Sequence, residues 1–196
     1  MRVSPVTMTL CAVALMSCSG LPLRGPGPVP TFAETRARSV AAFLEDRETG
    51  LSRAQIAQVS RVVITEADRT GFTPGLIAAL IHVESSGHNF AISRAGALGL
   101  MQLLPDTARE VAERQGLAWQ GPQMLFDPAL NVRLGVDYLA ELYERFGDIE
   151  LALAAYNWGP SYIALLQQAG GEIPDDYAQR VLRYYADAAR EVGLGS

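Results

Sequence analysis

The sequence contains no lysine, and all 16 of its basic residues are arginines. This absence excludes a Walker-type phosphate loop and a Schiff-base mechanism, since both need a lysine amine. With two cysteines and two histidines, the chain has too few ligands for the usual structural zinc sites and too few thiols for a disulfide network. We therefore expect neither a metal nor a cofactor.

The charge balance argues against a nucleic-acid partner. Twenty-one acidic residues against 16 arginines give a net charge of −5, whereas proteins that bind a phosphate backbone need a basic surface. Of the 196 residues, 49% are hydrophobic and 19% are charged, a composition typical of one folded domain with an apolar core.

Residues 1–17 have the pattern of an export signal. Arg2 is followed by an apolar run from Met8 to Met16, which is too short for a bilayer span of about 20 residues. The segment 15–18, Leu-Met-Ser-Cys, resembles the lipobox of bacterial lipoproteins. That resemblance implies cleavage before Cys18, a lipid on Cys18, and an anchor in the outer membrane facing the periplasm. An ordinary secretory signal, with Cys18 incidental, is the alternative.

Residues 18–33 are rich in proline and glycine, a composition typical of an extended tether. A disordered N-terminus without a tethering role would have the same composition. The sequence thus divides into a signal peptide (1–17), a lipidated cysteine with its tether (18–33) and a domain over 34–196.

Helical patterns dominate that domain. Ser52 with Gln55 predicts a capping box for a helix that ends near Gly71. Two further helix starts pair a capping residue with proline, at 73–74 (a helix ending at Gly87) and at 127–128 (a helix ending at Gly147). Shorter helices are expected at 105–115, 149–157, 160–169 and 174–192. No segment alternates with a period of two, so we predict an all-α domain with room for a small β-hairpin within 88–98.

Glu84 is the first candidate for chemistry. It ends a mostly apolar helix, where burial and the negative end of the helix both favour the protonated acid. A carboxylic acid that keeps its proton at neutral pH can protonate a glycosidic oxygen. For an isolated Glu, a solvated side chain in a fraying last turn is the more common explanation.

Two later segments contain residues that could form a binding site together with Glu84. Gly99-Leu100-Met101-Gln102 supplies a glycine that lets the backbone approach a ligand and an amide that can bond to sugar hydroxyls. Ala155-Tyr156-Asn157 closes a helix, and we expect the Tyr156 hydroxyl to point towards Glu84. Taken singly, each segment also fits a core loop or an ordinary helix end.

In this order, Glu84-Ser85, residues 99–102 and residues 155–157 resemble the three signature motifs of the soluble-type lytic transglycosylases of the lysozyme-like superfamily. The resemblance implies a lysozyme-like fold, peptidoglycan glycan strands as substrate, and Glu84 as the single catalytic acid and base. It also implies that Ser93 steers the N-acetyl group of the substrate and that Tyr177 is a further cleft residue. The substrate-binding residues implied are Ser93, Gly99, Leu100, Met101, Gln102, Tyr156, Asn157 and Tyr177.

The same resemblance implies a mechanism without a second carboxylate. In that family the 6-hydroxyl of N-acetylmuramic acid attacks its own anomeric carbon and leaves a 1,6-anhydro end. The sequence is compatible with this because no Asp or Glu lies between Ser85 and Pro105. Two alternatives remain, a goose-type lysozyme-like hydrolase with Asp106 as the nearest candidate partner, and a non-catalytic peptidoglycan-binding lipoprotein.

Overall fold

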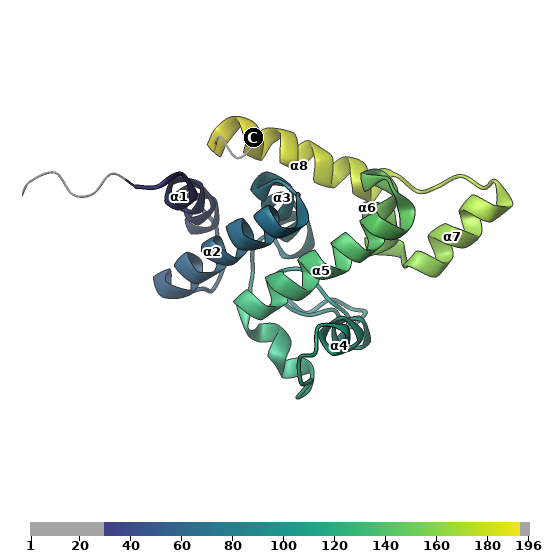
Figure 1. Cartoon of the computed structure of the whole chain (residues 1–196), viewed down its shortest axis with the longest axis horizontal. Helices are drawn as coiled ribbons and strands as arrows, with labels where there is room; N and C mark the ends of the chain where they lie inside the picture. Colours follow the sequence, from purple (N-terminus) through teal and green to yellow (C-terminus); the bar gives the residue numbers. More distant parts are fainter. Residues whose placement is uncertain (1–29, 193–196) are drawn as a thin grey trace, which may run out of the picture.

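The computed structural model of the chain describes residues 30–192, with side chains through residue 187. Eight α-helices and one 3₁₀-helix make up the regular structure of this part of the chain (Figure 1). In chain order they are α1 (Phe32–Glu45), α2 (Arg53–Thr70), α3 (Pro74–Ser85), α4 (Pro105–Arg114), η1 (Pro122–Phe126), α5 (Pro128–Phe146), α6 (Ile149–Trp158), α7 (Pro160–Ala169) and α8 (Asp176–Val192).

The predicted all-α class is confirmed, because no regular strand occurs within residues 30–192. The segment proposed for a hairpin forms two isolated antiparallel bridges, Ile92 with Leu98 and Leu98 with Leu103. The predicted starts of α2, α3 and α5 are also confirmed: Ser52, Thr73 and Asp127 each accept a hydrogen bond from a backbone amide in the first turn.

Several boundaries differ from the expected ones. The ends of α4 and α6 are shifted by one residue, and α8 begins at Asp176 instead of residue 174. The helix α1 begins at Phe32, inside the segment taken as tether, because Thr31 and Glu34 form a capping box. The helix α3 ends at Ser85 instead of Gly87, since Ser86 already adopts a left-handed conformation with φ of 54°. The expected signal peptide, Cys18 and most of the tether lie outside the described residues.

Helix α3 forms the centre of the fold. All of its residues from Pro74 to Ile81 are buried, which is the pattern of a helix surrounded by others. It packs most extensively against α8 and also contacts α1 and α2. These helices, with α6 and part of α5, enclose the larger of two hydrophobic clusters, which we call the large lobe.

A second cluster, the small lobe, lies on the other side of α5. It joins Leu98 and Leu103 to residues of α4 and η1 and to Leu134 of α5. Figure 1 shows α4 on the opposite side of α5 from α3 and α8. Tyr138 and Tyr156 contact both clusters and their ring centroids are 5.2 Å apart, so the two lobes meet along these rings.

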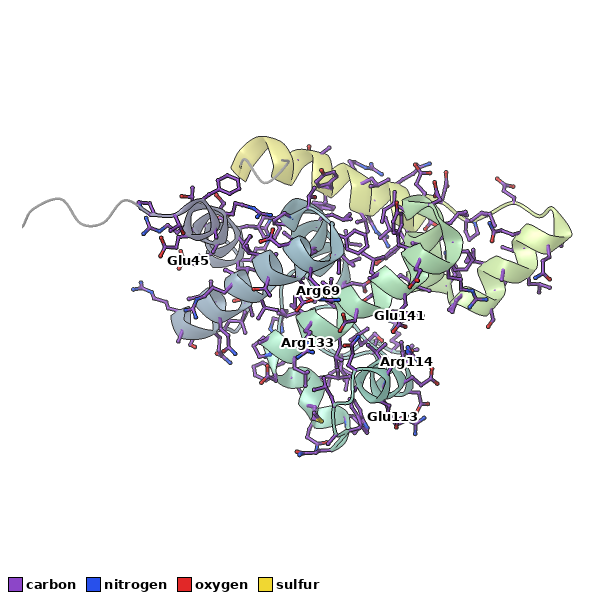
Figure 2. All side chains as sticks on the ribbon, viewed as in Figure 1. Glu45, Arg69, Glu113, Arg114, Arg133 and Glu141 are labelled. Carbon is purple, nitrogen blue, oxygen red and sulfur yellow. The ribbon has the colours of Figure 1, made fainter. Side chains whose placement is uncertain are left out.

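Ion pairs, one of them exposed and one with buried acids, add connections to α5. Arg114 of α4 forms a fork with Glu141 of α5, with nitrogen–oxygen distances of 3.0 and 2.6 Å, and Figure 2 shows the two labelled side chains together. Arg69 of α2 donates to Glu66 and to the buried Asp137 of α5. The exposed Arg114–Glu141 pair contributes only about 0.2–1 kcal/mol to the free energy of unfolding, so the apolar clusters carry most of the stability.

Candidate active site

A cleft of about 310 Å³ opens beside the end of α3. Its walls come from α3, from the 93–104 loop and from the end of α6. The lining residues are Glu84, Ser93, Ala95, Ala97, Gln102, Leu104, Tyr156 and Asn157. The three predicted motifs, far apart in the sequence, therefore each contribute to one cleft, and Glu84 is the one carboxylic acid among its described lining residues.

Two larger hollows, of about 550 and 640 Å³, lie along α1 and at its connection to α2. We assign the site to the smaller cleft on chemical grounds. The cleft contains Glu84, whose pKa is raised to about 7, and it brings together residues of all three motifs, whereas neither larger hollow is lined by a residue of these motifs.

Glu84 sits in the last turn of α3 with its carboxyl group largely buried. Burial raises its pKa from 4.5 to about 7, against the opposing effects of a hydrogen bond from Tyr177 and the charge of Arg180. The expected tendency of Glu84 to keep its proton is therefore supported, since with this pKa a large share of the molecules carry it at neutral pH, and desolvation is the main cause. A group with this pKa can give and take a proton near pH 7.

Tyr177 of α8 donates a hydrogen bond from its hydroxyl to Oε1 of Glu84. The ring is 2% exposed, and burial raises the pKa of its hydroxyl well above 10, so Tyr177 remains a neutral donor. Arg180 lies over the Tyr177 ring, 5.5 Å from its centroid. The extensive packing of α8 on α3 thus places a donor on the acid.

This arrangement corrects one prediction. The Tyr156 hydroxyl does not point to Glu84; it donates to the carbonyl oxygen of Met101 at 2.8 Å. Tyr156 lines the cleft with its ring, and its hydroxyl fixes the 99–102 turn. The hydroxyl that donates to Glu84 belongs to Tyr177 instead. Tyr177 does not itself line the cleft.

Ser85 connects the acid to the 99–102 turn. Its hydroxyl donates to the carbonyl oxygen of Leu100 at 2.8 Å and accepts from the amide of Gly87 at 3.1 Å. Because Ser85 directly follows Glu84, this pair of bonds fixes the end of α3 relative to the cleft loop.

Within the turn, Gly99, Leu100 and Met101 are buried beneath the cleft and do not line it. The expected reason for Gly99 was close approach of a ligand, and the structure gives a different one. With φ of 78°, Gly99 faces Asn131 and Leu125, and an added Cβ would lie 2.4 Å from the Leu125 carbonyl oxygen. Gly99 is required by internal packing.

Gln102 is the member of the turn that reaches the cleft. Its side-chain NH₂ group donates to the carbonyl oxygens of Ala91 (3.0 Å) and Gly99 (2.9 Å). Since both partners only accept, the amide orientation is fixed, and its own carbonyl oxygen is the atom left to accept a bond from a ligand. Ser93 offers a donor where Gln102 offers an acceptor. The Ser93 oxygen accepts from the amide of Ala97 at 3.0 Å, so its hydroxyl hydrogen is left to donate to a ligand.

Asn131 of α5 is a residue that the sequence reasoning missed. It is fully buried, and its amide donates to the carbonyl oxygens of Leu98 and Leu125, each at 3.0 Å, while Oδ1 accepts from the amide of Met101 at 2.8 Å. A polar residue in the same helical stripe as Leu134, Tyr138 and Leu142 was the available signal.

The pH dependence of the site follows from these contacts. Glu84 acts as an acid only when protonated, so the rate is expected to fall as pH rises through about 7. The Tyr177 bond lowers the pKa of Glu84, so Tyr177→Phe should raise that pKa and move the fall in kcat/KM to higher pH. Tyr156→Phe is the matched control, since its hydroxyl bonds to Met101, and its pH profile should keep the wild-type position. An alkaline limb that is unchanged in Tyr177→Phe would contradict the assignment.

A partly buried glutamic acid with a pKa near 7, bonded to a neutral donor and lining a cleft, defines a site for general acid–base chemistry. Residues 61–172 match the family model described as the transglycosylase SLT domain. The chain therefore belongs to the SLT transglycosylase domain family. The match includes Glu84 and the other two motifs, whereas Tyr177 lies beyond it.

Named relatives agree with this membership. The membrane-bound lytic murein transglycosylase F of Desulfosudis oleivorans is 42% identical over 109 residues, which are 52% of this chain and 22% of that protein. The soluble lytic murein transglycosylase of Salmonella typhimurium is 36% identical over 87 residues, 43% of this chain and 14% of that protein. The chain thus spans less than a quarter of the length of either relative.

A solved structure shares the fold. An inactive mutant of the lytic transglycosylase Slt from Pseudomonas aeruginosa superposes with a TM-score of 0.60 and 30% identity, over 68% of this chain and 24% of that one. The predicted family and its all-α, lysozyme-like fold are thus confirmed.

Proposed function

We propose that this protein is a peptidoglycan lytic transglycosylase that cleaves the β-1,4 bond between N-acetylmuramic acid and N-acetylglucosamine. The observation that carries the proposal is Glu84, a cleft acid whose pKa is raised to about 7 and which is the one carboxylic acid among the described lining residues. Membership of the SLT family supports the same substrate class.

Glu84 is sufficient for both proton transfers of such a reaction. Its carboxylic acid protonates the oxygen of the leaving N-acetylglucosamine as the bond from that oxygen to the anomeric carbon breaks. The resulting carboxylate then takes the proton of the muramoyl 6-hydroxyl, whose oxygen forms the new bond to the anomeric carbon. The product is a 1,6-anhydromuramoyl end; no water is consumed, and Glu84 regains its proton.

The remaining cleft residues supply positioning. The free hydroxyl hydrogen of Ser93 can donate to the carbonyl oxygen of an acetamido group, and the free carbonyl oxygen of Gln102 can accept from a sugar hydroxyl or amide. The Tyr156 ring and the exposed Asn157 complete the wall. We assign direct substrate contact to these four residues, and a supporting role to Gly99, Leu100, Met101 and Tyr177.

A hydrolytic mechanism receives no support from the nearby acids, since it needs a second carboxylate to act as nucleophile or to activate water. Asp106 is exposed in the first turn of α4 and pairs with Arg109 at 3.3 Å. Asp127 caps α5 through the amide of Leu130 at 2.9 Å. Both have structural roles at helix starts, as the sequence suggested.

Mass spectrometry of the muropeptides released from purified sacculi tests the proposal. Anhydromuramoyl ends are the expected result. Reducing ends would replace the proposal with a lysozyme-like hydrolase, and binding without release would replace it with a non-catalytic peptidoglycan-binding protein.

We further propose that the protein acts from a lipid anchor on Cys18 in the bacterial envelope, at the outer membrane and facing the periplasm. The support is the lipobox-like segment before Cys18 and the proline-rich residues that follow it. A name such as membrane-bound lytic murein transglycosylase F shows that membrane attachment occurs among relatives. Within residues 30–192, none of the helices has the length and apolar character to cross a bilayer.

The anchor makes a clear prediction for cell fractionation. The wild-type chain should sediment with membranes and be extracted by detergent, whereas Cys18→Ala should release it, because a membrane-bound acyl chain would be absent. Wild-type protein found entirely in the soluble periplasmic fraction would favour the ordinary secretory signal. Cys11→Ala is the matched control, since Cys11 lies inside the expected signal peptide.

A further inference from the structure

Two exposed aromatic rings lie at the junction of α6 and α7, directly after the cleft wall. Trp158 follows the lining residue Asn157 in the chain, and Tyr162 is in the first turn of α7. Trp158 is 48% exposed and Tyr162 is 47% exposed. Their ring centroids are 6.3 Å apart, with 47° between the ring planes, so they form a single aromatic surface.

The backbone holds this surface in place. Gly159 ends α6 with φ of 89°, and its amide donates to the carbonyl oxygen of Ala155 at 2.9 Å. Pro160 starts α7 at once, and Ile163 is fully buried in the large lobe. A fixed junction and a buried anchor hold the backbone that carries the two rings, which lowers the cost of ordering this backbone when a ligand binds.

The cleft alone is small for a polymer. Its 310 Å³ lies at the lower end of the range of about 300–1,000 Å³ for small-molecule pockets. A glycan strand bound at Glu84 must therefore continue over the surface beyond the cleft walls. At the end of the cleft that Asn157 lines, the next residue in the sequence is Trp158.

We propose that Trp158 and Tyr162 form a sugar-stacking surface that extends the glycan-binding cleft beyond Asn157. This inference rests on the proposed function, because it takes the same glycan strand as ligand. A pyranose ring has a face of C–H bonds and a rim of hydroxyls. Its face can cover an aromatic ring while the hydroxyls remain in water, which matches a half-exposed Trp with a neighbouring Tyr hydroxyl.

Continuity with the cleft favours a glycan over a protein as the occupant. Leu165 on α7 is also exposed, at 62%. Of these exposed side chains, Trp158 directly follows the lining residue Asn157 and pairs with Tyr162. A protein partner that covered this surface would leave the affinity for glycan independent of Trp158, and that outcome of the test below would overturn the proposal.

The first test measures affinity as a function of strand length. The full chain carrying Glu84→Gln is used because its slow turnover allows binding to be measured. The ligands are peptide-free peptidoglycan strands sorted as disaccharide, tetrasaccharide and octasaccharide. Trp158→Ala or Tyr162→Ala should weaken octasaccharide binding by about tenfold and should weaken disaccharide binding much less. An equal loss at all lengths would indicate a distorted Asn157 wall, and no loss would leave the rings without a role; either result overturns the proposal.

Phe32→Ala is the matched control for loss of an exposed aromatic ring. Phe32 is 72% exposed on α1, and Figure 1 shows α1 at the opposite end of the molecule from α7. Its affinities should equal those of the parent at every strand length. A loss in Phe32→Ala as large as in Trp158→Ala would show that the effect is not specific to this surface.

Fluorescence gives an independent measurement, because the chain has only two tryptophans. Trp119 packs against the small lobe, so Trp119→Phe leaves Trp158 as the single fluorophore. Saturable quenching or a blue shift with octasaccharide, and little change with disaccharide, is expected. An unchanged Trp158 spectrum under saturating octasaccharide would contradict stacking.

Failure of this inference can be separated from failure of the proposed function. Anhydro products from the wild-type chain, with affinities that do not depend on Trp158 or Tyr162, would refute only the stacking surface. Length-dependent binding through both rings, with no anhydro products, would refute only the proposed activity.

Discussion

The Glu84→Gln variant is expected to release soluble muropeptides from purified sacculi about 10²–10⁴-fold more slowly than the wild-type chain. Gln keeps the shape of the side chain and can still accept a bond from Tyr177, but it has no proton to transfer. Asp106→Asn is the matched control, since it neutralises an exposed acid outside the cleft, and it should retain most of the rate.

The stability of Glu84→Gln shows whether its lower rate comes from the missing proton transfer or from a less stable fold. The pKa of Glu84 is about 7 in the folded chain and 4.5 as its ordinary value, so the folded state holds this proton more tightly. The free energy of unfolding therefore decreases as pH rises from about 4.5 to 7, by about 2–3 kcal/mol in all. Gln avoids this cost, so above about pH 7 the variant should be at least as stable as the wild type by thermal unfolding.

A slow but stable Glu84→Gln variant is thus the expected combination. Near-wild-type release of muropeptides would remove Glu84 from the mechanism. If Asp106→Asn instead abolished turnover in a folded protein, a second carboxylate would take part and the hydrolytic alternative would gain support.

The helix starts were predictable because their signals are local. Ser52, Thr73 and Asp127 each bond to an amide three residues later, so a short stretch of sequence contains the whole interaction. The same locality made Glu84 recognisable as an acid at the end of an apolar helix, and the structure adds how strongly burial raises its pKa.

Side-chain partners across the fold were not predictable in this way. Tyr156 and Tyr177 are both aromatic residues near the site, and only the docking of α8 on α3 decides which hydroxyl reaches Glu84. Likewise, the glycine at position 99 could serve a ligand or a neighbouring backbone. The choice depends on α5 and η1, whose Asn131 and Leu125 lie 26 or more residues further along the chain.

The second large effect is expected at Asn131, which connects α5, the 99–102 turn and the end of η1. Asn131→Ala leaves the amide of Met101 and the carbonyl oxygen of Leu125 without the bonds from this side chain. The carbonyl oxygen of Leu98 loses one of two bonds, since it still accepts from the amide of Leu103 at 3.2 Å. Each buried unpaired group costs about 1–3 kcal/mol, and the lost side-chain volume adds a cavity cost. We expect the free energy of unfolding to fall by about 3–5 kcal/mol and the midpoint of thermal unfolding by roughly 10 °C.

Equilibrium denaturation of Asn131→Ala, Asn131→Leu and Asn157→Ala tests the physical cause of that loss. Leu fills the space of Asn131 but provides no polar atoms, so it should retain most of the destabilisation if unpaired backbone groups are responsible. Asn157 is exposed on the cleft wall, and its substitution should change stability by less than about 0.5 kcal/mol. An Asn131→Leu variant as stable as the wild type would show that filling the space is sufficient and that the three hydrogen bonds do not hold the turn. In that case, the orientation of Gln102 would have to be fixed by its own bonds to Ala91 and Gly99.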